Sequence, residues 1–149
     1  MKRYARFAAM IATSTLVMFG LMYLSAYSLD HVLFSQTRAY MALYMGAAML
    51  IVMLAFMLHM YRDTRLNVAL FAGAGLLFVV SLWLVRSQAT VEDVAWMKAM
   101  IPHHSIAILT SERADLSDPR VRELAEQIIT TQREEIARMK ALIAELEQR

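Results

Sequence analysis

The sequence contains no cysteine, only four glycines and only two prolines among its 149 residues. Without cysteine there is no thiolate for a structural zinc site, which takes four cysteine or histidine ligands. No glycine-rich loop is present to bind phosphate, and no nucleophile–base combination or metal-spaced pair of carboxylates is present for catalysis. We therefore do not expect an enzyme.

Acidic residues are almost missing from the first part of the chain. Residues 1–86 hold seven Lys/Arg and two Asp/Glu, a balance of +5, whereas residues 87–149 hold eight and eleven, a balance of −3. The basic excess lies beside apolar runs, so it indicates membrane orientation and not a nucleic-acid surface. No acidic residue lies within those runs, and so the sequence gives no sign of a proton relay.

Three apolar runs are long enough to span a bilayer, which takes about 20 helical residues. They cover residues 7–29, 39–61 and 66–85. Lys2, Arg3, Arg6, Arg62 and Arg65 lie at one side of these runs. The other side has only Arg38, opposed by Asp30, and Arg86, which is outnumbered. The positive-inside rule then predicts a cytoplasmic N-terminus and a C-terminal domain in the periplasm, beyond a bacterial inner membrane. Residues 1–86 are accordingly predicted to form a membrane domain of three transmembrane helices.

Residues 1–28 have a second interpretation, as a cleavable signal peptide with its cleavage site at Ala26-Tyr27-Ser28. The apolar region is long for such a peptide, so we favour a retained helix. Under both interpretations two further spans remain, and the C-terminal part ends outside. Exposed cysteines oxidise in the periplasm, which agrees with their absence from this sequence.

Residues 87–149 are predicted to form an antiparallel helical hairpin outside the membrane. Thr90 resembles an N-cap, so the first helix is expected to begin just after it and to end near residue 113. Asp118 and Pro119 are typical of the N-cap and first position of a second helix, which should reach almost to the C-terminus. Two helices alone bury too little surface to be stable, so the hairpin must pack on a second copy, on the membrane helices or on a partner. The simplest solution is a homodimer that completes a four-helix bundle.

The first of these helices carries two methionines and two histidines within eight residues, namely Met97, Met100, His103 and His104. At about 100° per residue, three of the four side chains share one helix face, and His103 turns aside. Thioether and imidazole donors together suit Cu(I), and methionine persists where a thiol would oxidise. Folding the chain back about residues 116–117 brings Met139 within about a turn of Met97.

Each of these features also has a purely structural interpretation. Met97 and Met100 fill irregular gaps well, so taken alone they would indicate helix packing. Pro102 is predicted to kink its helix, which either opens a metal pocket or bends the helix around a neighbour. His31 lies in the loop between the first two spans and could approach the periplasmic site, but we expect a single loop histidine to be solvated.

Five methionines recur at every fourth position of the second apolar run: Met41, Met45, Met49, Met53 and Met57. A drift of about 40° per step makes them a slow spiral along a helix. Such a ladder of sulfur atoms would offer Cu(I) a route through the bilayer. Methionine also packs well between helices and against lipid, and we favour packing.

The segment from about residue 91 to 146 resembles the domain-of-unknown-function 305 family. The likeness lies in three stretches, Met97-Lys98-Ala99-Met100-Ile101-Pro102-His103-His104, Asp118-Pro119-Arg120-Val121 and Glu135-Ile136-Ala137-Arg138-Met139-Lys140. The resemblance implies a ferritin-like helical domain, and an association of some members with periplasmic copper binding or tolerance. By that resemblance the copper ligands would be Met97, Met100, His103, His104 and Met139.

The predicted fold is therefore all-α, with three transmembrane helices followed by an extramembrane hairpin that forms half of a ferritin-like bundle. The leading hypothesis for function is an inner-membrane protein that binds Cu(I) and contributes to copper handling or tolerance. The alternative is a membrane-anchored interaction or assembly module without metal, in which the methionine and histidine residues serve helix packing.

Overall fold

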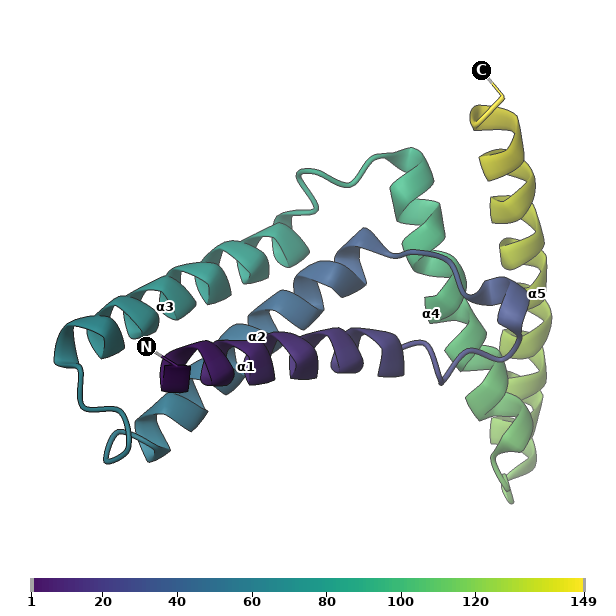
Figure 1. The fold of residues 1–149 in the computed structure, drawn as a ribbon. Coiled ribbons are helices and arrows are strands. Elements are labelled where there is room, and N and C mark those ends of the chain that lie inside the picture. Colours follow the sequence, from purple (N-terminus) through teal and green to yellow (C-terminus); the bar gives the residue numbers. More distant parts are fainter. Residues whose placement is uncertain (1, 149) are drawn as a thin grey trace. The chain divides into compact units, whose positions relative to one another are not determined.

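The computed structural model describes residues 2–148, which form five α-helices, one short 3-10 helix and no strand. The elements are α1 (Lys2–Leu21), η1 (Leu29–His31), α2 (Gln36–Phe56), α3 (Thr64–Ser87), α4 (Asp93–Arg113) and α5 (Pro119–Leu146) (Figure 1). The all-α prediction is confirmed for these residues. The chain divides into a first unit, Met1–Met22 with Thr37–Thr90, and a second unit, Tyr23–Gln36 with Val91–Arg149.

The three helices of the first unit are each long and apolar enough to cross a membrane. Their most apolar windows have mean hydropathies of 1.4, 2.0 and 2.5, yet only 11%, 22% and 11% of those windows is buried within the protein. Large apolar side chains such as Leu16, Val52 and Leu76 are instead exposed. Helices that are apolar on their outer surface are typical of a membrane environment.

The first predicted span is wrong at its outer end. We expected helix to residue 29, but α1 ends at Leu21 and the chain turns through the segment Tyr23–Gln36. There the Ser35 N–H donates to the Tyr23 hydroxyl (2.9 Å), and the Tyr27 N–H donates to Ser105 Oγ of α4 (2.7 Å). Backbone groups satisfied in this way need no helix. Gly20 lies just before this end, but an isolated glycine within an apolar run is only a weak signal of a helix end.

The other two spans differ from their predicted bounds by a few residues. Helix α2 begins and ends earlier than the predicted 39–61, and α3 extends the predicted 66–85 at both ends. The side chain of Asp63 caps α3 by accepting the Leu66 N–H at 3.1 Å. A polar cap just before the apolar run accounts for the earlier start of α3.

The helices of the first unit meet through small side chains. Ala42, Gly46, Ala47 and Ala74 are all buried. Gly46 lies so close to α1 that a Cβ atom there would be 2.3 Å from Thr15 Oγ1. Small residues allow this close approach between membrane helices, where the surrounding lipid provides no hydrophobic drive for association.

A second group of contacts closes one end of the first unit. Phe7, Ile11, Leu54 and Tyr61 form a buried cluster. Three residues of the methionine ladder, Met49, Met53 and Met57, pack against it. This contact agrees with the packing interpretation of the ladder, because each of these methionines has neighbours to fill space against.

In the second unit α4 and α5 lie side by side (Figure 1). Three contacts along the pair join Lys98 to Glu147 (2.5 Å), His104 to Glu135 (3.0 Å) and Glu112 to Arg133 (3.1 Å). The residue numbers rise on one helix as they fall on the other. The buried core between the two helices consists of Met97, Ile101, Ile108, Ile136, Met139 and Ile143.

The ends of α4 and α5 agree only in part with the sequence. Helix α4 begins at Asp93 with Glu92 as N-cap, so the predicted cap at Thr90 is wrong, and the Thr90 hydroxyl pairs with that of Tyr40 at 2.9 Å. Asp118 caps α5 as predicted, with Pro119 in the first turn. Pro102 is buried within α4, and the helix continues past it without interruption.

The segment Tyr23–Gln36, here named the docking loop, packs on α4 and α5. Ser105 is fully buried where the loop meets α4, and its Oγ lies 3.0 Å from His31 Nδ1. The ammonium of Lys140 pairs with the Asp30 carboxylate. The second unit therefore includes a segment that the sequence assigned to the membrane domain of residues 1–86, and this loop adds a third element to two helices that would bury little surface alone.

Candidate metal site

Three of the predicted ligands come together along the α4/α5 interface. Met97 of α4 and Met139 of α5 are both buried in its core, as folding the chain back on itself predicts, and Met100 packs against that core while half-buried. Met97 and Met100 are three residues apart on α4, so they lie on neighbouring parts of the same helix face. The structure thus gathers three thioethers from two helices.

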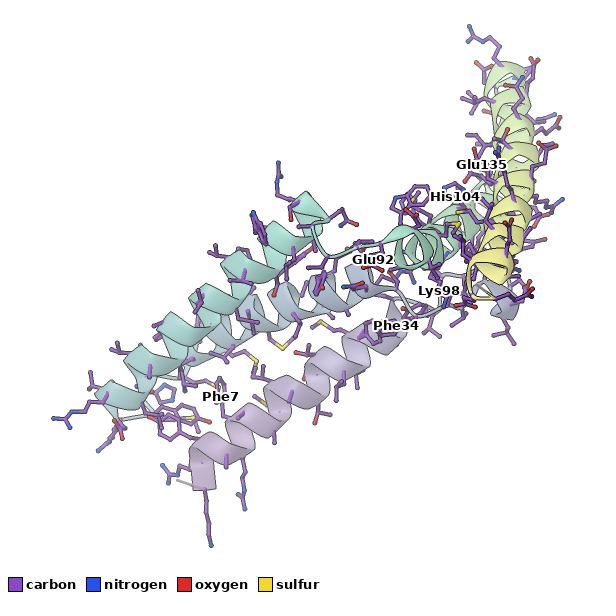
Figure 2. The ribbon with its side chains drawn as sticks, turned by 90° about the horizontal axis from the view of Figure 1, so that it is seen from above. Phe7, Phe34, Glu92, Lys98, His104 and Glu135 are labelled. Atoms are coloured by element: carbon purple, nitrogen blue, oxygen red, sulfur yellow. The ribbon has the colours of Figure 1, made fainter. Side chains whose placement is uncertain are left out.

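The two histidines are placed differently. His104 is half-buried, and its Nδ1 lies 3.0 Å from Glu135 Oε2 across the interface (Figure 2). His103 is exposed, and its ring centroid is 6.3 Å from that of His104 at an interplanar angle of 61°. Adjacent helical residues diverge by about 100°, so only one of the two can face the interface.

The Nδ1 atom of His104 is a buried polar atom that lacks a hydrogen-bond partner. Glu135 is close enough, but its oxygen does not have the alignment that a hydrogen bond requires. The Glu135 side chain is 48% exposed, so it is free to rotate into alignment. A carboxylate in this position is what fixes the tautomer and ring orientation of a metal-binding histidine.

Burial lowers the pKa of His104 below its usual value. The nearby Glu135 carboxylate opposes this shift, and the neighbouring His103 adds to it. The imidazole of His104 is therefore neutral at neutral pH. A neutral imidazole keeps a lone pair for a metal, whereas a protonated one does not.

The donor set restricts the kind of metal that would fit. Among residues 2–148 no group of three or more His, Cys, Asp or Glu side chains is placed to hold a metal ion. The further donor atoms that the α4/α5 interface offers near His104 are methionine sulfur atoms. One imidazole with up to three thioethers is a set of soft and borderline donors, which fits Cu(I) better than a hard cation.

Sequence reasoning missed Glu135 as the partner of His104. Glu135 is a polar residue that interrupts the apolar stripe of α5, and this interruption was the one sequence feature that pointed to it. The stripe consists of Val121, Leu124, Ile128, Ile136, Met139 and Ile143. The pairing itself depends on the register of α5 against α4. Register between two helices is set by tertiary packing and cannot be read from either helix alone.

The expectation for His31 is wrong. Its side chain is 12% exposed and contacts Ser105, so it is not solvated. Burial lowers its pKa, with Asp30 opposing the shift and Lys140 adding to it. Ser105 and His104 point about 100° apart on α4, so His31 lies on a different side of the helix from the candidate site.

The candidate site lies in the part of the chain that matches a known family model. Residues 84–149 match the family model "Domain of unknown function (DUF305)". This segment is similar to DUF305. The DUF305 match contains all five predicted ligands and Glu135, whereas the docking loop and helices α1 and α2 lie outside it.

One curated protein is similar to part of the chain. The chain is 37% identical over 68 residues to "Uncharacterized protein L153" of Acanthamoeba polyphaga mimivirus, which corresponds to 44% of this chain and 45% of that protein. The chain thus covers less than half the length of this relative. No solved structure matches the chain. Neither the DUF305 description nor the relative's name states a function, so copper binding stays a prediction.

Proposed function

We propose that this chain is an inner-membrane protein whose α4/α5 pair binds Cu(I) and contributes to copper handling or tolerance. One observation carries the proposal: a half-buried imidazole, His104, stands against a carboxylate at the interface whose core includes Met97 and Met139, with Met100 packed against that core. Met100 lies one turn before His104 on the same helix, so their donor atoms can serve one ion.

Each residue has a distinct part in the proposed site. Glu135, once rotated into alignment, would hold the proton of His104 on Nδ1 and leave Nε2 as the nitrogen that donates to the metal. Met100, half-buried at the edge of the core, supplies the most accessible thioether. Met97 and Met139 supply buried sulfur atoms, and His103 would bind from the exposed side. Bound Cu(I) would be the cargo of the protein and not a catalytic group.

A competition titration of full-length protein in detergent, with a chromophoric Cu(I) chelator, tests the site. The key variant combines Met100→Leu with His104→Asn, because leucine keeps the volume and asparagine keeps a polar group beside Glu135. The matched control is His59→Asn, since His59 is exposed in the first unit. We expect the double variant to lose Cu(I) affinity by at least tenfold, equivalent to about 1.4 kcal/mol, while the control does not change. Equal binding by wild type and double variant would exclude the site.

The proposed topology places the N-terminus in the cytoplasm and α4 and α5 in the periplasm. The basic residues in the first turns of α1 (Lys2, Arg3 and Arg6) and around the start of α3 (Arg62 and Arg65) support this orientation. Because the chain has no cysteine, single cysteines can report the side directly. In intact spheroplasts we expect an impermeant maleimide to label Ser117→Cys and not Thr64→Cys. The reverse pattern would contradict the orientation.

The alternative function is a membrane-anchored interaction or assembly module without metal. The observation that favours it is the burial of Met97 and Met139 among four isoleucines, where thioethers serve as ordinary core residues. The copper titration separates the two functions. A homodimer completing a four-helix bundle is compatible with both, and light scattering on the full-length protein tests it. A well-folded monomer would contradict the bundle.

A further inference from the structure

The docking loop has two chemically different sides. Its polar groups contact the protein: Asp30 pairs with Lys140, His31 meets Ser105, and the Ser35 N–H donates to Tyr23. Leu33 packs against the α4/α5 core. The other large aliphatic side chains and Phe34 are exposed, namely Leu24 by 77%, Leu29 by 90%, Val32 by 41% and Phe34 by 67%. No large apolar side chain of α4 or α5 exceeds 55% exposure.

Single exposed leucines are normal on a protein surface, but several in one short loop mark a contact surface. The chain itself indicates what covers them. The loop joins α1 to α2, two helices that are apolar enough to cross a membrane, and so both of its ends emerge at the same bilayer surface. Leu24 follows the end of α1 by three residues, and Phe34 precedes the start of α2 by two.

The charge of the loop also suits a lipid surface. Asp30 is the only acidic residue of Tyr23–Gln36, and it is already paired with Lys140 of α5. The loop contains no lysine or arginine. The contact surface is therefore apolar and uncharged, as in segments that insert into the boundary between headgroups and acyl chains.

We propose that the docking loop inserts Leu24, Leu29 and Val32 into the interface of the bilayer that α1 and α2 cross. Its polar groups contact α4 and α5 within the second unit. The proposal rests on the membrane spans of the proposed function and is independent of copper binding. The occupant is the lipid of the surrounding leaflet.

Site-directed spin labelling of the full chain tests this proposal. The protein has no cysteine, so Leu24→Cys and Leu29→Cys each introduce one labelling site, and both positions are exposed enough for the fold to tolerate the change. Val52→Cys, 53% exposed on α2, is the lipid reference, and Gln127→Cys, exposed on α5, is the water reference. The protein is reconstituted in vesicles of phosphatidylcholine and phosphatidylglycerol, and the collision rates with oxygen and with a nickel chelate are measured.

The expected result is an oxygen-to-nickel ratio at Leu24 and Leu29 that is shifted from the Gln127 value at least halfway to the Val52 value. Nickel access at Leu24 and Leu29 equal to that at Gln127, with Val52 protected, would overturn the loop proposal and leave the spans intact. Low access to both reagents at Leu29 would also overturn it, because a protein surface would then cover the loop. Free nickel access at Val52 would overturn the spans and the loop proposal together.

Discussion

The helices of the first unit approach closely through alanine and glycine, have one cluster of large buried side chains at one end, and expose leucine and valine. Helices α4 and α5 instead meet through isoleucine and methionine and expose glutamate and arginine. In both units the polarity of each helix face matches what surrounds it. The faces differ because the surroundings differ. In the first unit lipid can cover the large apolar side chains, so small residues are left to mediate helix contacts.

In the second unit water covers the outside, so burial of large apolar side chains must hold the helices together. The docking loop belongs to the second unit by its contacts, but its exposed leucines resemble the exterior of the first unit. Each unit should therefore respond to a different class of substitution. Large-to-small changes should damage the second unit, and small-to-large changes should damage the first.

The largest effect is expected from Ile101→Ala in α4. Ile101 is fully buried between α4 and α5, so its truncation should lower the free energy of unfolding of the second unit by about 2–5 kcal/mol. Leu124→Ala, at a position 55% exposed, should cost less than about 0.5 kcal/mol. Hydrogen exchange of α4 and α5 amides in the full chain measures both. Similar losses in the two variants would show that this interface is not the core.

A small-to-large change should damage the first unit. Gly46→Ala would place a Cβ 2.3 Å from Thr15 Oγ1, forcing α1 and α2 apart at a cost of about 1–3 kcal/mol. At Gly73 a Cβ would meet nothing within 4 Å, so Gly73→Ala should be neutral or slightly stabilising through its helix propensity. Thermal unfolding in detergent compares the two. Equal behaviour of the variants would contradict the close approach of α1 and α2.

A local effect is expected where the docking loop meets α4. Ser105→Ala removes the acceptor for the Tyr27 N–H and the hydroxyl beside His31, at a cost of about 1–3 kcal/mol. Exchange of the Tyr27 amide should accelerate while exchange in α1–α3 does not change. Ser117→Ala, at an exposed position, serves as the control. Unchanged protection of Tyr27 would mean that this hydrogen bond does not hold the loop.

The smallest expected effect is a loosening of the docking loop in acid. The folded protein lowers the pKa of His31 by burial, so below the usual His value the unfolded chain binds more protons and stability falls as pH falls. The hydrogen bond from Lys140 lowers the pKa of Asp30 to about 2, so its contribution is present above 3.8 and is lost as pH falls towards 2.

Amide exchange in the docking loop, followed as a function of pH and corrected for its intrinsic rate, separates the two contributions. His31→Gln should abolish the step just below the usual histidine pKa and leave the more acidic one. Asp30→Asn should do the opposite. A wild-type profile without either step would contradict the proposed contacts.

Several features were predictable because they depend on local pattern. Charge-free apolar runs indicated the three helices of the first unit, and Asp118-Pro119 indicated the start of α5. The outer end of α1 was not predictable, because contacts of Tyr23 and Tyr27 with distant residues replaced the helix there. Thr90 has the residue type of a cap but pairs with Tyr40, a residue fifty positions away.

The candidate site, too, was predictable only in part from the sequence. Helical spacing alone placed Met97, Met100 and His104 on one face of α4 and turned His103 aside. The partnership of His104 with Glu135 required the register of α5. The contact of Ser105 with His31 required a loop from the other end of the chain to return to α4.

Two features could be predicted without the structure: which segments are apolar enough for a membrane, and which donor atoms share a helix face. Both depend on the periodicity of one continuous segment. The packing of the docking loop on α4 and α5, and the position of Glu135 at His104, depend instead on contacts between separate elements. Such pairings follow from the packing of side chains between elements, which the pattern within any single element does not contain.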